Sequence, residues 1–385
     1  MKIKSTILFF VLIYTAYSCS SQGDGSVSVV DVNGSKMFVS SFQDIKPDTM
    51  IIPLSSLVEN CSLVQLQTTK EAFFTPWYTT VTEKYIGVRD HNIGSYKLFA
   101  RSGKFLYNIG TRGQGPGEYN FPLYDDIIDE KNGLIYIAPF LSDKIQIFNT
   151  SGVFLKNIVA PHRLQKAKIF LSDGILSVIH MPTKEQAIAF QFDAKTGQLL
   201  NEIAAPENCI ITNIEGEIFN TRNVAGINGF YHFGSRDTLY HYDTASNNFH
   251  PLFSMEFGSA KVVLKSSFIL NEHIIMTRFY RGELDRGFVP GGLIATDTKN
   301  MKSFYIKIVN DYYGNITAVT DIRQLRNGYY VYNLQPEDLM DIIDARLAES
   351  SCTEKDRQIL KKTLSTLKKN TNNVVFIGKL RKELK

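Results

Sequence analysis

The chain has 385 residues, of which 44% are hydrophobic and 12% aromatic, and its 42 basic and 38 acidic residues give a formal charge of +4. This apolar content and charge balance exclude a mainly disordered chain, and a single strongly apolar run excludes a polytopic membrane protein. Because the positive charges are few in excess and spread out, no nucleic-acid partner is predicted. The 19 Tyr, 26 Phe and 26 Gly, with many Ile and Val, favour β structure.

The N-terminal residues 1–18 have the features of a secretory signal peptide. Lys2 and Lys4 precede a short apolar run over residues 7–14, which is too short to span a bilayer comfortably. Cys19 follows small residues and precedes a polar stretch, so the region resembles a bacterial lipobox, although Tyr17 stands where that pattern has a small residue. The resemblance implies that Cys19 is the lipidated first mature residue. The alternative is plain secretion with a free Cys19.

Acylation of Cys19 implies a lipoprotein of the bacterial cell envelope, anchored to the outer membrane and facing the periplasm or the outside. Acyl chains hold a folded domain at a membrane surface without inserting it. The lipid anchor is then the only contact with the membrane. We expect residues 19–48 to comprise a tether and a first strand, followed by one folded unit over residues 49–385.

One sequence pattern recurs along residues 49–385: an apolar strand, a polar or glycine turn, and a second apolar strand. The five turn centres are spaced 45 to 52 residues apart, at Gly103, Gly152, Gly197, Asn248 and Asn300. A period near fifty residues built from strands and hairpins is typical of propeller blades. These five copies account for residues from about 76 to 308.

The remaining strands predict a sixth blade. Residues 321–325, 329–334 and 373–380 supply three strands, and an N-terminal strand within 36–66 would close the ring. Between the last two strands, residues 336–370 have apolar side chains at three- and four-residue spacing, which predicts a helical hairpin. The sequence therefore predicts an all-β, six-bladed β-propeller with a helical hairpin inserted in the last blade.

The most distinctive local motif is GTRGQGPGEY at 110–119, which is not a P-loop because no Lys-Ser or Lys-Thr follows its glycines. Arg112, Gln114, Glu118 and Tyr119 are candidate ligand-binding residues. The alternative is that the loop only turns the chain between blades, with Arg112 and Glu118 paired locally.

This motif, within GKFLYNIGTRGQGPGEYNFP, resembles the six-bladed propeller lipoproteins of Bacteroides and relatives, which are similar to NHL and TolB propellers. SRDTLYHYD at 235–243 also resembles a blade strand of that family, and Arg236 within it is a further ligand-binding candidate. The resemblance implies the fold and an envelope lipoprotein, and it implies no reaction.

A metal site is the main alternative to simple binding, because related NHL-type propellers include a zinc- and calcium-dependent lyase. His91, His180 and His232 fall near strand ends in three blades, so they are weak candidates for Zn or Ca ligands at the axis, although none has a local metal-binding spacing. Strand-end histidines facing solvent explain the pattern equally. Asp125, Asp126 and Asp129 could supply a glycosidase carboxylate pair, but three acids around a turn are interpreted as a solvated turn. No cofactor is otherwise predicted.

The leading hypothesis is a non-catalytic, monomeric propeller that binds a glycan, a peptide or an envelope protein. The alternative is an NHL-like metal-dependent hydrolase or lyase with an axial site. A third hypothesis is an assembly scaffold that contacts its partner through the helical hairpin.

Overall fold

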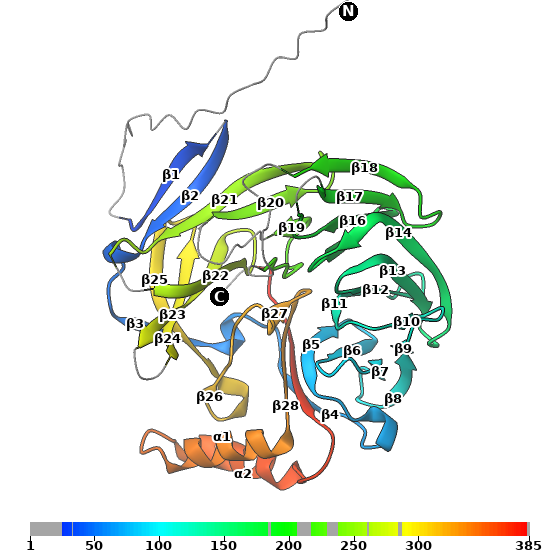
Figure 1. Ribbon diagram of the computed structural model, residues 1–385. Helices are drawn as coiled ribbons and strands as arrows, with labels where there is room; N and C mark the ends of the chain where they lie inside the picture. Colours follow the sequence, from blue (N-terminus) through cyan, green and yellow to red (C-terminus); the bar gives the residue numbers. More distant parts are fainter. Residues whose placement is uncertain are drawn as a thin grey trace, which may run out of the picture.

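The computed structural model describes residues 25–32, 34–183, 186–205, 217–228, 238–259, 262–283 and 287–382. Over these residues the chain is nearly all β, and six sheets stand around a common axis like the blades of a propeller (Figure 1). This confirms the predicted fold class. Cys19, Arg236 and His232 lie outside the described residues.

Blades 1 to 3 are four-stranded antiparallel sheets made from consecutive strands. Blade 1 contains β5 (Pro76–Val81), β6 (Tyr85–Asp90), β7 (Tyr96–Ala100) and β8 (Phe105–Ile109). Blade 2 contains β11 (Leu123–Asp129), β12 (Leu134–Pro139), β13 (Ser142–Asn149) and β14 (Phe154–Leu164). Blade 3 contains β15 (Lys168–Ser172), β16 (Ile175–Ile179), β17 (Ala187–Asp193) and β18 (Leu199–Ala204).

Blades 4 to 6 each include strands from the N-terminal segment. Blade 4 contains β19 (Ile227–Asn228), β20 (Thr238–Asp243) and β21 (Asn248–Glu256), extended by β2 (Ser35–Ser41) and β1 (Val27–Val32). Blade 5 contains β22 (Val262–Ile269), β23 (Ile274–Glu283), β24 (Gly287–Asp297), β25 (Lys302–Asn310) and β26 (Ile316–Thr317), with β3 (Thr49–Pro53) beside β25. Blade 6 contains β27 (Leu325–Arg326), β28 (Tyr329–Leu334), β29 (Val374–Lys379) and β4 (Ser62–Gln65).

The ring is closed by pairing between the two ends of the chain. β4 runs antiparallel to β29, with Val64 opposite Val375, which confirms the closing strand expected within 36–66. In addition, β2 pairs in parallel with β21 and β3 pairs in parallel with β25, which the sequence did not predict. Residues 27–65 therefore bind the outer edges of three successive blades, where unpaired backbone groups would otherwise be exposed.

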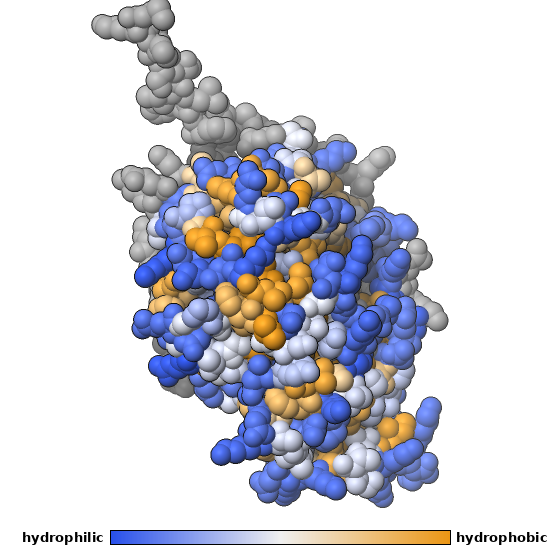
Figure 2. Space-filling view, turned by 90° about the vertical axis from the view of Figure 1, so that its right-hand side faces the viewer, coloured by the Kyte–Doolittle hydropathy of each residue, from blue (hydrophilic) through white to orange (hydrophobic). Residues whose placement is uncertain are grey.

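The blades pack face to face through alternating apolar side chains. Ile145 and Ile147 of β13 belong to the same buried cluster as Ile169 and Val178 of blade 3. Alternation leaves other side chains on the outside, and the side of the ring formed by the outer strands of blades 2 and 3 shows hydrophobic residues interspersed with hydrophilic ones (Figure 2). Leu155 of β14 and Leu200 of β18 are among these exposed residues.

The helical hairpin lies between β28 and β29, as predicted (Figure 1). It consists of α1 (Pro336–Ala348) and α2 (Glu354–Thr366). Thr353 caps α2, because its hydroxyl accepts a hydrogen bond from the Asp356 amide at 3.1 Å. Leu339 and Leu360 are fully buried in the core shared by blades 5 and 6. Among the described residues, no helix is long and apolar enough to cross a membrane.

A two-stranded ribbon, β9 (Thr111–Arg112) and β10 (Glu118–Tyr119), forms the connection from blade 1 to blade 2. Gly110 at its start has φ +65°, and an added Cβ would lie 2.6 Å from the Tyr119 ring. The glycine is required here by both backbone conformation and close packing.

Candidate functional site

The inner strands of the ring bring a cluster of charged side chains to the axis. Asp125 and Asp126 lie in the middle of β11, Arg89 at the end of β6 and Arg326 in β27. These four residues are at most 2% exposed. Because they come from blades 1, 2 and 6, their contacts with one another fix the relative positions of separate blades.

Asp125 is the centre of this cluster. Its carboxylate is ion-paired with Arg222, lies 3.5 Å from Arg326 Nη2, and accepts a hydrogen bond from the Ile169 amide at 2.9 Å. Burial by itself would raise the pKa of Asp125, but the surrounding cations, Arg222 foremost, outweigh burial and hold this pKa well below its ordinary value. The carboxylate is therefore ionised at neutral pH.

Asp126 is held in a similar way. Its Oδ1 lies 2.9 Å from Arg89 Nε, and its Oδ2 accepts a hydrogen bond from the Tyr96 hydroxyl at 2.9 Å. The interpretation of Asp125 and Asp126 as part of a solvated turn was wrong. Only Asp129 lies near the turn, where it accepts a hydrogen bond from the Asn132 amide. Acids inside an apolar strand need buried partners, and the cations supply them.

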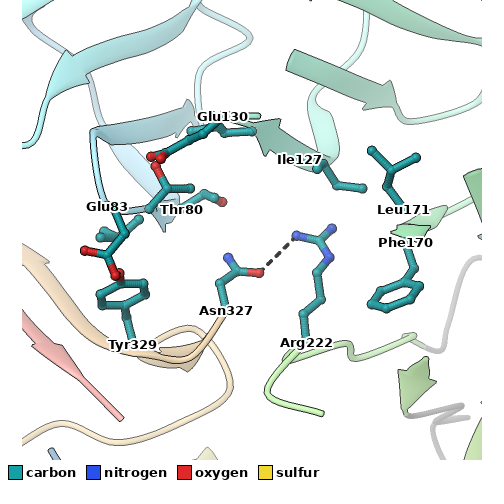
Figure 3. A pocket seen from close by; sticks show the side chains of 12 residues that line it. Thr80, Glu83, Ile127, Glu130, Phe170, Leu171, Arg222, Asn327 and Tyr329 are labelled. Carbon is teal, nitrogen blue, oxygen red and sulfur yellow. Dashed lines mark hydrogen bonds between the residues drawn. The ribbon is translucent and has the colours of Figure 1, made fainter. Parts of the chain in front are cut away.

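A pocket of about 380 Å³ opens at one end of the axis, beside this cluster (Figure 3). It lies where β5, β11 and β15 end, so its wall combines residues from three adjacent inner strands with the turns that follow them. Blades 4 and 6 contribute to its floor. The pocket is lined by Thr80, Val81, Thr82, Glu83, Ile127, Ile128, Glu130, Phe170, Leu171, Arg222, Asn327 and Tyr329.

Arg222 and Asn327 form the floor, and both have positive φ, at 53° and 55°. This conformation is uncommon for arginine and marks a position determined by its surroundings. Arg222 donates from Nη1 to the Asp126 carbonyl oxygen at 2.8 Å and to Asn327 Oδ1 at 3.3 Å. Because these contacts hold Arg222 in place, Arg222 in turn orients the Asn327 amide.

The rim of the pocket carries two acidic side chains. Glu83 accepts hydrogen bonds from the Tyr329 hydroxyl at 2.8 Å and from Lys379 Nζ at 3.0 Å, and these bonds lower the pKa of Glu83. Glu130 accepts a hydrogen bond from the Lys84 amide at 2.6 Å. Both carboxylates retain a second oxygen that can accept a hydrogen bond from a ligand.

The opposite end of the axis has aromatic and basic residues near the starts of the same strands. Lys168 Nζ lies 4.3 Å from the Tyr124 ring centroid and 3.7 Å from Glu217, and the Tyr124 hydroxyl donates a hydrogen bond to Glu217. Burial lowers the pKa of Lys168 to about 8, although Glu217 opposes this shift. Arg89 lies over the Tyr78 ring at 4.2 Å. The ion-pair cluster separates this end from the pocket.

The residues of the GTRGQGPGEY motif lie toward the periphery, and none of them lines the pocket (Figure 1). Arg112 and Gln114 are exposed. Glu118 accepts a hydrogen bond from the Gly115 amide at 2.8 Å, within its own loop. Tyr119 is 4% exposed, and its hydroxyl bonds to the backbone of Tyr96 and Gly94. A ligand role for this loop stays a prediction.

Two of the three candidate metal ligands, His91 and His180, lie among the described residues. His91 is exposed and contacts the Trp77 ring. His180 is fully buried, its Nε2 lies 2.7 Å from the Ala187 carbonyl oxygen, and burial lowers its pKa to about 4. Its ring contacts His162, at 5.0 Å between centroids. In the part of the chain that the structure describes, no three His, Cys, Asp or Glu residues are placed to hold a metal ion.

The axial residues were missed because propeller sites combine positions from different blades and have no local motif. The available signal was the pair of acids inside the apolar stretch LYDDIID at 123–129. Charged residues at the centre of a buried strand, away from its turn, indicate either an ion-pair cluster or a site.

Comparison with known families identifies the chain. Its residues 37–379 match the domain of unknown function DUF4934. The chain belongs to the DUF4934 family. A comparison with curated protein sequences finds no match to this DUF4934 member.

Solved structures with a similar chain path include an exported protein from Bacteroides fragilis, with a TM-score of 0.55 and 16% identity, covering 86% of this DUF4934 chain and 100% of that chain. A DUF4221 member from Bacteroides vulgatus has a TM-score of 0.46 and 11% identity, covering 84% and 98%. Virginiamycin B lyase from Staphylococcus aureus has a TM-score of 0.40 and 12% identity, covering 60% and 74%. The first of these supports the propeller fold of the DUF4934 chain.

Proposed function

We propose that this DUF4934 protein is an envelope-anchored, non-catalytic binding protein that takes a glycan or peptide group into the pocket at the end of its axis. The observation that carries the proposal is the pocket itself. Its volume of about 380 Å³ lies within the range of small-molecule sites, and it combines an apolar wall with a few polar groups.

The pocket is well suited to binding because its floor is rigid. Arg222 is held by Asp125, by the Ile169 carbonyl oxygen at 3.1 Å and by the Asp126 carbonyl oxygen. A floor fixed by a buried ion pair needs little reorganisation when a ligand enters, which improves affinity.

The chemistry beside the pocket supports binding without catalysis, since Lys168, with its pKa of about 8, lies at the opposite end of the axis. General acid–base catalysis requires a group whose pKa lies near the working pH. Asp125 has a strongly lowered pKa and is surrounded by cations, so it is poorly suited to exchange protons with a substrate. The alternative, an NHL-like hydrolase or lyase using Zn or Ca, requires converging metal ligands, and it is separated from the leading proposal by the experiment below.

The proposed envelope anchor rests on the N-terminal sequence. Cys19 precedes the first described strand, β1, by eight residues, which span at most about 29 Å when fully extended. An acyl anchor at Cys19 would therefore keep blade 4 close to the membrane surface. The exported Bacteroides fragilis protein of similar fold is consistent with this location. Replacing Cys19 by Ala should move the protein from the membrane fraction to the soluble fraction, and retention in the membrane would contradict the anchor.

The binding proposal is tested by thermal unfolding of residues 20–385 with panels of glycans and peptides. A ligand at a hundredfold excess over its Kd stabilises the folded state by about 2.7 kcal/mol. Leu171→Trp places a large ring in the pocket and should abolish the shift. Leu199→Trp is the matched control, because Leu199 is 37% exposed on β18 and outside the pocket.

A ligand-induced shift that persists in Leu171→Trp would exclude the pocket as the binding site. A shift that requires Zn or Ca and disappears with chelator would favour the enzyme alternative. Capture of an envelope protein that is lost only on deletion of residues 336–370 would favour the scaffold hypothesis.

A further inference from the structure

The orientation of the Asn327 amide can be assigned without ambiguity. Arg222 has only hydrogen-bond donors, and its Nη1 lies 3.3 Å from the Asn327 side chain. The atom that faces Arg222 must therefore be the amide oxygen. The amide nitrogen then points away from Arg222 and toward the Thr80 side of the pocket (Figure 3).

Two buried polar atoms at the pocket lack a hydrogen-bond partner among the described residues. They are Asn327 Nδ2 and the hydroxyl oxygen of Thr80, a residue that is only 3% exposed. A buried polar group without a partner typically costs about 1–3 kcal/mol. Two such groups lining one pocket therefore point to a ligand that hydrogen-bonds to both of them.

The charges around the pocket disfavour an anionic ligand. Arg222, the only cation among the lining residues that the structure describes, is already paired with Asp125, while the rim carries Glu130 and Glu83, the latter paired with Lys379. A carboxylate entering the pocket would pass Glu130 and reach a guanidinium whose charge Asp125 already balances. An ammonium group deep in the pocket would meet the donor groups of Asn327 and Arg222, which cannot accept its hydrogen bonds.

A neutral hydroxyl group suits both the floor and the rim of the pocket, because it can donate a hydrogen bond and also accept one. Hydroxyls can accept from Asn327 Nδ2 on the floor and donate to Glu83 and Glu130 at the rim. The remaining wall is apolar, and Figure 3 places Ile127, Phe170 and Leu171 across the pocket from Glu83 and Tyr329. Such a wall covers the C–H face of a sugar ring while the polar groups bind its edge.

We infer that the axial pocket binds the terminal unit of a neutral saccharide, with Asn327 and Thr80 on its deepest hydroxyls and the aromatic ring of Phe170 against its carbon face. This inference rests on the proposed binding function and specifies its ligand class. The pocket volume of about 380 Å³, at the lower end of the range for small-molecule sites, suits one or two sugar rings.

The ligand class is tested by calorimetry on residues 20–385 with matched sugars. Glucose, galactose, mannose and N-acetylglucosamine, with their methyl glycosides and disaccharides, form the neutral set. Each is compared with the corresponding uronic acid and the corresponding amino sugar, which differ in charge. We expect at least one neutral member to bind, and its charged counterparts to bind at least tenfold more weakly. Preferential binding of a uronic acid, an amino sugar or a dipeptide would overturn the assignment.

Thr80→Val tests the contact at the floor. Valine keeps the branched shape, and the hydroxyl it removes has no hydrogen-bond partner in the described parts of the chain, so folding should be preserved or slightly improved. We expect the Kd for the neutral sugar to rise about three- to tenfold, as for loss of one hydrogen bond. Thr111→Val, at an exposed position of β9 outside the pocket, is the matched control and should leave Kd unchanged.

The possible outcomes separate the two proposals. If a dipeptide binds and Thr80→Val weakens it, the pocket is a binding site but the saccharide assignment is wrong. If a sugar binds equally to Thr80→Val, Thr111→Val and Leu171→Trp, the pocket is not its site and the inference fails. If neither sugars nor peptides bind, both the ligand class and the proposed binding function are wrong, and the two unpartnered atoms are satisfied by water alone.

Discussion

Replacement of Asp125 by Asn is expected to destabilise the whole ring. The substitution keeps the shape of the side chain but removes the charge that faces Arg222 and Arg326. Asparagine has a single side-chain oxygen to accept hydrogen bonds from the surrounding guanidinium groups. Its NH2 group would then face other hydrogen-bond donors. The site is 1% exposed, so water cannot replace the lost carboxylate oxygen.

Removing one partner of a buried ion pair typically costs 3–5 kcal/mol, because the other charge is left buried and uncompensated. Asp125 lies within 4.0 Å of Arg89 and is closer to Arg222 and Arg326, so we expect a cost of at least about 3 kcal/mol. Guanidinium unfolding, followed by circular dichroism at neutral pH, measures the free energy of unfolding. Asp129→Asn is the control, because Asp129 bonds to its near neighbour Asn132 at a turn, and it should cost less than about 1 kcal/mol.

A double-mutant cycle with Arg222→Met isolates the interaction free energy between Asp125 and Arg222. If Asp125 and Arg222 act together, the double variant should be more stable than the sum of the single effects predicts, by about 0.5–3 kcal/mol. A cost below about 1 kcal/mol for Asp125→Asn, or strictly additive effects, would refute the conclusion that this carboxylate holds the axis together.

Three further predictions concern other parts of the fold. Gly110→Ala should destabilise the protein by roughly 1–3 kcal/mol in chemical unfolding, because φ is +65° and the new Cβ would lie 2.6 Å from the Tyr119 ring; an unchanged midpoint would show that the loop adapts. The lowered pKa of His180, about 4 against 6.5, means that the unfolded state binds the proton more readily, so stability should fall by about 3 kcal/mol as pH drops from 6.5 to 4. His180→Gln should reduce the loss of stability between pH 6.5 and 4. An unaltered dependence of stability on pH would show that other groups cause this loss. Thr353→Ala should cost about 1 kcal/mol through loss of the α2 cap, and no change in unfolding would mean that the Asp356 amide finds another acceptor.

Blades 1 to 3 were predictable from sequence because each contains a hairpin whose turn requires a glycine. Gly103, Gly152 and Gly197 all have positive φ near 85°, as tight turns demand. The parallel pairing of β2 with β21 and of β3 with β25 was not predictable, because it involves no connecting turn. The closing strand β4 was anticipated only because a ring with an open seam would expose two sheet edges.

The candidate site was less accessible to sequence reasoning than the fold. Thr80 and Asn327 are 247 residues apart and unremarkable in composition, and they meet only because the ring brings blades 1 and 6 together. The glycine-rich motif around Gly110 attracted attention as a sequence pattern, yet Glu118 bonds within its own loop and Tyr119 bonds to the backbone of blade 1. Local motifs reveal local structure, whereas an axial pocket is defined by closure of the whole ring.

The pairing of N-terminal strands with blades 4, 5 and 6 has a consequence for biosynthesis. Val64 of β4 and its partner Val375 are separated by about 310 residues, so at 5–20 residues per second the strand waits about 15–60 s for its partner to be made. β4 is thus among the first strands to leave the ribosome and among the last to be paired. Until then blade 1 lacks its completed neighbour, blade 6, and the axial pocket, which blade 6 helps to line, is incomplete. The chain must therefore remain unaggregated, with exposed strand edges, until its final residues arrive.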